Sequence, residues 1–143
     1  MRDRKQKNML RKTDIAYIAG LFDGEGSITY KKYKSKKTRN NKTKYYDCWR
    51  IVMEITMTDA SVLRWIHLIL GCGTLRKKPR PKHLTQWRWR CSFRDAYYVA
   101  RLLWPYAHTK LPKINQIIAH YKGKVMNDKI VDMVEYKKVM NLE

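Results

Sequence analysis

The sequence predicts an α+β fold, in which an antiparallel sheet carries helices on one face. Segments with alternating polar and apolar residues come in two pairs, each joined by a polar stretch. Helical segments precede, separate and follow these pairs, and strands joined as hairpins form antiparallel sheets. The chain of 143 residues suits a single domain. We expect that domain at residues 13–143, after a basic N-terminal arm at residues 1–12.

The first predicted helix begins directly after the basic arm. Thr13 and Asp14 are suited to capping its start, and the glycines from Gly24 onward are suited to ending it. Its apolar residues recur at helical spacing, at Ile15, Ile18, Ala19 and Phe22.

The first pair of strands follows this helix. Residues 27–33 alternate and predict a strand, whereas residues 34–44 are polar and basic and predict a mobile hairpin loop suited to phosphates. Residues 45–58 predict the returning strand. One face of this strand carries Trp49, Ile51, Met53, Ile55 and Met57, and the other carries Arg50, Val52, Glu54 and Thr56.

The second half repeats the helix and hairpin order. Asp59 is placed to cap a strongly apolar helix that stops at Gly71. Residues 73–93 predict a hairpin with a basic, proline-bearing turn. Its returning strand directs Trp87, Trp89, Cys91 and Phe93 to a core, and Gln86, Arg88, Arg90 and Ser92 away from it. Further helices are expected at residues 95–104, 112–122 and 128–140.

Composition narrows the class of partner. The formal net charge is +20, with 32 Lys and Arg against 12 Asp and Glu, which favours nucleic acid over the alternative of an anionic membrane surface. Cys48, Cys72 and Cys91 are odd in number and form no CxxC pair, which argues against a disulfide framework and a cysteine zinc site. No apolar run approaches the roughly 18 residues of a membrane span, so we expect a soluble, intracellular protein.

Small residues and two carboxylates mark the first helix. Ala16, Gly20 and Gly24 form one bare stripe, which fits either packing within the chain or a dimer seam. Asp23 and Glu25 lie where the helix ends, and there the macrodipole disfavours negative charge. A bound cation would relieve this charge, whereas a tight turn of the Asp-Gly type would explain only part of the run.

The stretch IAGLFDGEG, residues 18–26, resembles the LAGLIDADG motif of the homing endonucleases. Residues 57–65 resemble that family's junction of second strand and helix, and residues 105–116 resemble the segment that carries its active-site lysine. The likeness extends over residues 13–122. It implies an αββαββα fold with a saddle-shaped sheet, and an intron-encoded or free-standing endonuclease that breaks both strands of DNA with the help of a metal. A single motif implies a homodimer whose two motif helices meet through Ala16, Gly20 and Gly24.

The resemblance also implies roles for individual residues. Glu25 and the carbonyl of Gly24 would hold Mg²⁺, or another divalent cation such as Mn²⁺, and Asp23 would be structural. The motif has Asp where this chain has Glu25, whose side chain is longer by one methylene group. Lys110 would lie near the scissile phosphate, although it could be a plain surface lysine. Asp59 would order water beside the site, although its reading as an N-cap is sufficient by itself.

The expected DNA contacts lie on the polar face of the sheet. A saddle-shaped sheet along the major groove directs every second side chain to base edges, and a dimer would span roughly 20 base pairs of pseudo-palindromic sequence. The expected base contacts are Thr29, Lys31, Tyr33, Arg50, Thr56, Thr74, Arg76, Lys78, Gln86, Arg88 and Arg90. The expected phosphate contacts are Lys36, Lys37, Arg39, Lys42 and the N-terminal arm.

Two other classes of function fit parts of the sequence. A non-cleaving nucleic-acid binder, such as a maturase that binds intron RNA, would use the same basic sheet. A basic protein of the ribosomal or chromatin type would explain the charge of +20 but not the bare helix stripe. The resemblance implies an organelle, mitochondrion or chloroplast, or else a prokaryotic cytoplasm.

Overall fold

The computed structural model describes residues 10–79, 81, 82 and 84–122. Most of the expected N-terminal arm and the helix expected at residues 128–140 lie outside the described residues. The elements are α2 (Lys12–Glu25), β1 (Gly26–Arg39), β2 (Lys42–Met57), α3 (Ala60–Leu70), β3 (Thr74–Lys78), β4 (Gln86–Ser92), α4 (Phe93–Leu103) and α5 (Leu111–Lys122). The predicted order of helices and strands is therefore confirmed for this part of the chain.

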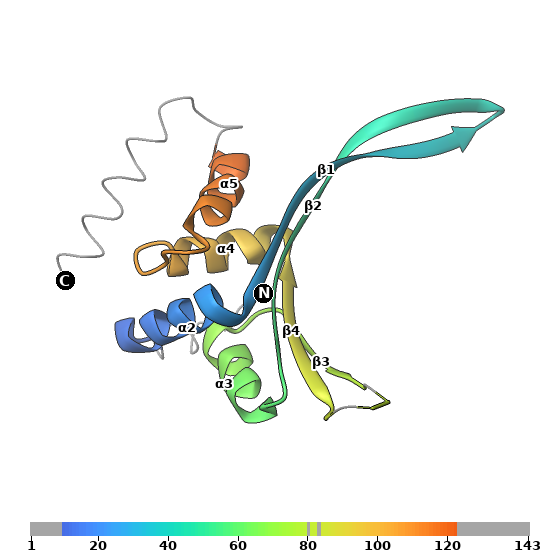
Figure 1. Ribbon diagram of the computed structural model, residues 1–143. Helices are drawn as coiled ribbons and strands as arrows, with labels where there is room; N and C mark the ends of the chain where they lie inside the picture. The colour runs from blue at the N-terminus through green and yellow to red at the C-terminus, as the bar shows by residue number, and fades with distance from the viewer. Residues whose placement is uncertain (1–9, 80, 83, 123–143) are drawn as a thin grey trace.

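The four strands form one antiparallel sheet in the order β1-β2-β4-β3. Figure 1 shows the labelled helices on one side of this sheet, and both ends of the sheet curve away from them. The predicted α+β class, with helices on one face, is confirmed. The opposite surface of the sheet is concave, and none of the described helices covers it.

The core lies between the helices and the inner face of the sheet. Alternate residues of β2, Ile51, Met53 and Ile55, are fully buried, and on β4 Trp89 is equally buried. Strand register explains why these residues are buried together, because Ile55 lies opposite Trp89 in the β2–β4 ladder and both face the core. The indole N–H of Trp89 donates to the carbonyl oxygen of Cys72 at 3.1 Å, so the buried ring leaves no polar atom unsatisfied.

The start of α2 differs from the prediction. Arg11 occupies the N-cap position and makes no capping bond with its side chain, and the helix begins at Lys12. Thr13 and Asp14 lie inside the first turn, so the prediction that they cap the helix was wrong. At the other end Gly24 is still helical, and the helix ends after Glu25.

The expected basic loop at residues 34–44 is instead a continuation of the strands. β1 and β2 stay paired to Arg39 and Lys42, and the chain turns through Asn40 and Asn41 alone. Both asparagines have positive φ, 53° and 61°, which is the requirement of a two-residue type I′ hairpin. Cross-strand backbone bonds do not need apolar side chains, so a polar and basic segment remains extended here.

The second helix and hairpin follow the prediction except at one residue. The carboxylate of Asp59 accepts from the backbone N–H groups of Ser61 and Val62 and caps α3, and Gly71 ends that helix with φ of 69°. Phe93, expected in the core beside Cys91, is 54% exposed. Its φ of 53° turns the chain from β4 into α4, so the strand alternation stops before it.

Candidate nucleic-acid interface and catalytic site

The sheet face opposite the helices brings the nominated base contacts together. In the β1–β2 ladder Lys31 lies opposite Arg50, and in the β3–β4 ladder Arg76 lies opposite Arg88. Residues opposite each other in a ladder share a face, and so do residues two apart along a strand. Register therefore places all of the predicted base-contact residues on one face: Thr29, Lys31, Tyr33, Arg50, Thr56, Thr74, Arg76, Lys78, Gln86, Arg88 and Arg90.

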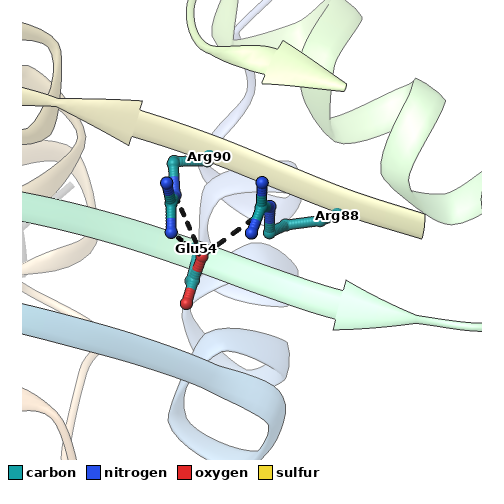
Figure 2. Close-up of polar contacts among 3 residues, drawn as sticks. All are labelled: Glu54, Arg88 and Arg90. Carbon is teal, nitrogen blue, oxygen red and sulfur yellow. Dashed lines mark hydrogen bonds and ion pairs between the residues drawn. The ribbon is translucent and has the colours of Figure 1, made fainter. Parts of the chain in front are cut away.

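One carboxylate interrupts this basic face. Glu54 lies opposite Arg90 in the β2–β4 ladder, and its Oε2 atom accepts from Nε of Arg90 at 3.0 Å. A second nitrogen of Arg90 lies 3.0 Å from the same oxygen, and Nε of Arg88 lies 4.0 Å from it. Figure 2 shows both guanidinium groups converging on Glu54 from the neighbouring strand.

Glu54 fixes the direction of these arginines. Its side chain is only 25% exposed, so the pairs are screened less than a fully exposed ion pair would be. A guanidinium group has five donors in a fixed fork, and the bond through Nε leaves others free for a second acceptor. Glu54 lies on the polar face predicted for its strand but is absent from the predicted DNA contacts. The sequence pattern that marks it is a single acid among basic neighbours on that face.

The junction of α2 and β1 is tightly built. A Cβ atom on Gly26 would lie 2.5 Å from the ring of Phe22 and 2.6 Å from its carbonyl oxygen. Only glycine therefore fits where the helix passes into the strand, and the backbone N–H of Gly26 donates to Phe22. This close turn fixes where Glu25, the last helical residue, lies relative to the sheet.

Asp23 connects this junction to a distant part of the chain. One of its carboxylate oxygens accepts from the backbone N–H of His108 at 2.8 Å, and the other accepts from the N–H of Lys110 at 3.0 Å. The carbonyl of Lys110 accepts from Ile114, so Lys110 occupies the N-cap position of α5. The positive end of the α5 dipole thus offsets the unfavourable place of Asp23 at the negative end of α2.

The structure therefore brings Lys110 beside the end of the motif helix. The backbone of Lys110 is hydrogen bonded to Asp23, which lies in the same helical turn as Glu25. The resemblance to the motif implies a structural role for Asp23, and the two bonds that it accepts are structural. Glu25 itself is exposed, as is Gly24.

The donors at this end of α2 are hard oxygen atoms. They comprise the Glu25 carboxylate and backbone carbonyls of the last turn, which lack partners within a helix. Within the described ranges no three His, Cys, Asp or Glu side chains gather into a possible metal site. This donor set fits Mg²⁺, which takes one or two carboxylates together with water and substrate phosphate.

Asp59 follows the end of β2 and precedes α3. Hydrogen bonds from the Ser61 hydroxyl, first, and from the Val62 backbone hold the pKa of its carboxyl below the usual value. The Ser61 hydroxyl donates to the carboxylate at 2.6 Å. The capping function is confirmed, while its proposed catalytic function stays a prediction.

One face of α2 is open. Apart from the neighbouring backbone of the helix itself, a Cβ atom on Gly20 or on Gly24 would meet nothing within 4 Å among the residues that the structure describes, and both residues are exposed. Tyr17 on the same helix is 56% exposed and its ring packs against the edge of Trp65. Among the described residues nothing packs against this stripe at Gly20 and Gly24, and a dimer seam there stays a prediction.

The order of elements and the motif at residues 18–26 together point to one family of proteins. The family model described as LAGLIDADG endonuclease matches residues 18–110, more than half of the chain. The chain thus belongs to the LAGLIDADG endonuclease family, as the motif suggested. No curated protein matches it.

Solved homing endonucleases share the fold. I-CvuI, solved with the I-CreI target DNA in the presence of Mg, superposes with a TM-score of 0.56 at 19% identity, covering 92% of this chain and 82% of that one. I-TnaI gives 0.56 at 18% identity, covering 92% and 88%. I-SmaMI bound to cleaved DNA gives 0.57 at 17% identity, but this chain covers only 42% of its length. Across the residues that the structure describes, none of the helices has the length and apolar character needed to span a bilayer.

Proposed function

We propose that this protein is a site-specific homing endonuclease that acts as a homodimer and makes a metal-dependent double-strand break in a long, pseudo-palindromic DNA target. The observation that carries the proposal is the pair of hydrogen bonds that the Asp23 carboxylate accepts from the backbone N–H groups of His108 and Lys110. These bonds join the motif helix, which ends in Glu25, to the segment that carries the lysine. They support a site that combines a metal-binding carboxylate, Glu25, with a cationic side chain, Lys110, which are the kinds of group that phosphodiester hydrolysis uses.

DNA binding is supported by the shape and charge of the sheet. The concave face carries the predicted base contacts, and the paired β1–β2 ribbon extends it with Lys37, Arg39, Lys42 and Lys44. Lysine and arginine on an extended ribbon suit phosphates, while the face near the sheet centre suits base edges in the major groove. Relatives of this fold, including the archaeal intron-encoded I-Vdi141I, were solved as DNA complexes.

A homodimer is supported by the open face of α2 and by length. Gly20 and Gly24 let a second helix approach at backbone distance. The chain covers less than half of I-SmaMI, so two copies together match the length of that enzyme. Pairing would bring two Glu25 side chains together, one for each DNA strand.

Different residues of this chain would have different roles at the scissile phosphate. Glu25 and the Gly24 carbonyl would hold the cation, which when bound stabilises charge on the leaving oxygen. Lys110 would stabilise negative charge on the phosphate, and Asp23 would hold Lys110 in place through its backbone.

The first experiment selects bound duplexes from a pool of random sequence and tests their cleavage in Mg²⁺ and in EDTA. Wild-type protein is expected to cut in Mg²⁺ only. Glu25→Gln is expected to bind the selected duplex and not cut it, and Asp95→Asn, at an exposed acid in the first turn of α4, is a matched control that cuts. Cleavage by Glu25→Gln at the wild-type rate would refute the catalytic assignment. Binding of intron RNA without any DNA cleavage would instead favour a maturase.

The second experiment tests the homodimer by sedimentation equilibrium. Gly20→Leu places a bulky side chain on the open stripe, where no described residue beyond the adjacent helix backbone lies within 4 Å of a Cβ atom. We expect this variant to be a folded monomer by circular dichroism, whose melting temperature no longer depends on protein concentration. The control Ala119→Leu enlarges an exposed residue of α5 and should remain a dimer. A wild-type protein that stays monomeric with and without DNA would refute pairing.

A further inference from the structure

Phe93 adopts a backbone conformation that phenylalanine rarely takes. Its φ is 53°, in the left-handed region, at the point where β4 passes into α4. This backbone conformation costs conformational energy and persists only where the surrounding structure imposes it. Backbone strain at a residue with a bulky side chain calls for a physical explanation.

Burial does not supply that explanation. Cys91 faces the core, so an extended chain would direct Phe93 to the core two residues later. The left-handed turn leaves the ring 54% exposed instead. The chain therefore presents a large apolar side chain to solvent at the end of a strand whose outer face is basic.

The surroundings of Phe93 combine apolar and cationic groups. The ring lines a surface hollow together with Thr29 and Val52, which contribute methyl groups, and with Arg50 and Arg90. Thr29 and Val52 lie opposite each other in the β1–β2 ladder, on the face that carries the expected base contacts. Apolar groups and two arginines thus line the same hollow on a surface suited to a polyanion.

We propose that Phe93, with Val52 and Thr29, binds the 5-methyl group of a thymine in each half of the DNA target. This inference rests on the proposed function, because it needs the sheet face to lie in the major groove. There the base edges present hydrogen-bond donors and acceptors, and the thymine methyl is the apolar group among them. Arg50 and Arg90 would hold the flanking phosphates or purine edges while the patch selects thymine.

The test uses the duplex selected by wild-type protein and replaces each thymine in turn with uracil, which lacks only the methyl group. Binding is measured in Ca²⁺ to wild type, to Phe93→Gly and to Leu84→Ala, a control at another exposed apolar residue. Glycine adopts positive φ readily, so Phe93→Gly should unfold at the wild-type temperature or higher.

We expect one thymine per half-site at which uracil weakens wild-type binding by about four-fold, the effect of burying one methyl-sized group. Phe93→Gly should show no difference between thymine and uracil there, while Leu84→Ala should behave as wild type. Uracil without effect at every position, or an uracil effect that survives in Phe93→Gly, would refute the thymine site. Unfolding of Phe93→Gly at a clearly lower temperature would show that the ring serves stability, whereas failure to select any duplex would refute the proposed function itself.

Discussion

Replacing Asp23 with alanine tests whether one carboxylate holds two parts of the site together. The variant removes two hydrogen bonds from backbone N–H groups, of 2.8 and 3.0 Å, to a charged acceptor. Such bonds each contribute about 1.5–3 kcal/mol, and because Asp23 is only half buried the freed N–H groups can bind water, so we expect a total loss of about 2–3 kcal/mol. For a domain of this length that corresponds to a fall of roughly 10 °C in the melting temperature.

The matched control is Asp47→Ala, which removes the same charge elsewhere. Asp47 pairs with Lys32 at 3.3 Å, and both side chains are about half exposed, at 53% and 52%. An exposed ion pair of this kind contributes about 0.5 kcal/mol, so the control should unfold almost as the wild type does. Both variants are measured by thermal unfolding followed by circular dichroism. If Asp23→Ala lost no more stability than Asp47→Ala, the reasoning about Asp23 would be wrong.

The same variant separates stability from catalysis. The sheet face is untouched in Asp23→Ala, so binding of the selected duplex should persist at a temperature where the protein is folded. Cleavage should slow, because Lys110 loses the bond that fixes its backbone. Unchanged single-turnover cleavage would show that Lys110 needs no such anchor.

Three further predictions concern stability, specificity and pH. Gly73→Ala should lower the free energy of unfolding in urea by roughly 2–4 kcal/mol. The reason is that φ of Gly73 is +86° and that the new Cβ would lie 2.7 Å from the indole nitrogen of Trp89. An unchanged urea midpoint would contradict this prediction. Glu54→Gln releases both arginines from their shared anion, so the affinity of the protein for any duplex should rise. The salt dependence of binding should steepen by about one counterion per subunit, and the ratio of the affinity for the selected duplex to that for a scrambled duplex should fall. A higher ratio would contradict this prediction. Asp59→Asn should be less stable than wild type at neutral pH, with the gap closing as the solution is made strongly acidic. The hydrogen bond from Ser61 lowers the pKa of Asp59 in the folded state, so its contribution is present above the unfolded pKa and is lost as pH falls through the folded one; a gap in melting temperature that is independent of pH would refute this.

Alternation along the strands was enough to predict the two faces of the sheet. Side chains on a strand have a period of two, so Trp89 and Arg90 must lie on opposite faces wherever the strand pairs. The same rule failed at Phe93, because a single positive φ ended the strand there. A different rule failed for residues 34–44, whose polar and basic composition predicted a loop. There Asn40 and Asn41 form a tight turn that lets the two strands continue.

The sequence by itself determined the motif helix, the basic sheet face and the family, because these depend on local periodicity and on a short contiguous motif. Only the tertiary structure decided that Asp23 holds the backbone of Lys110, a residue 87 positions away, and that Glu54 holds Arg90, which is 36 positions away. Contacts over such separations depend on how helices and strands pack and register against each other. That packing is a cooperative property of the whole domain, and no local pattern encodes it.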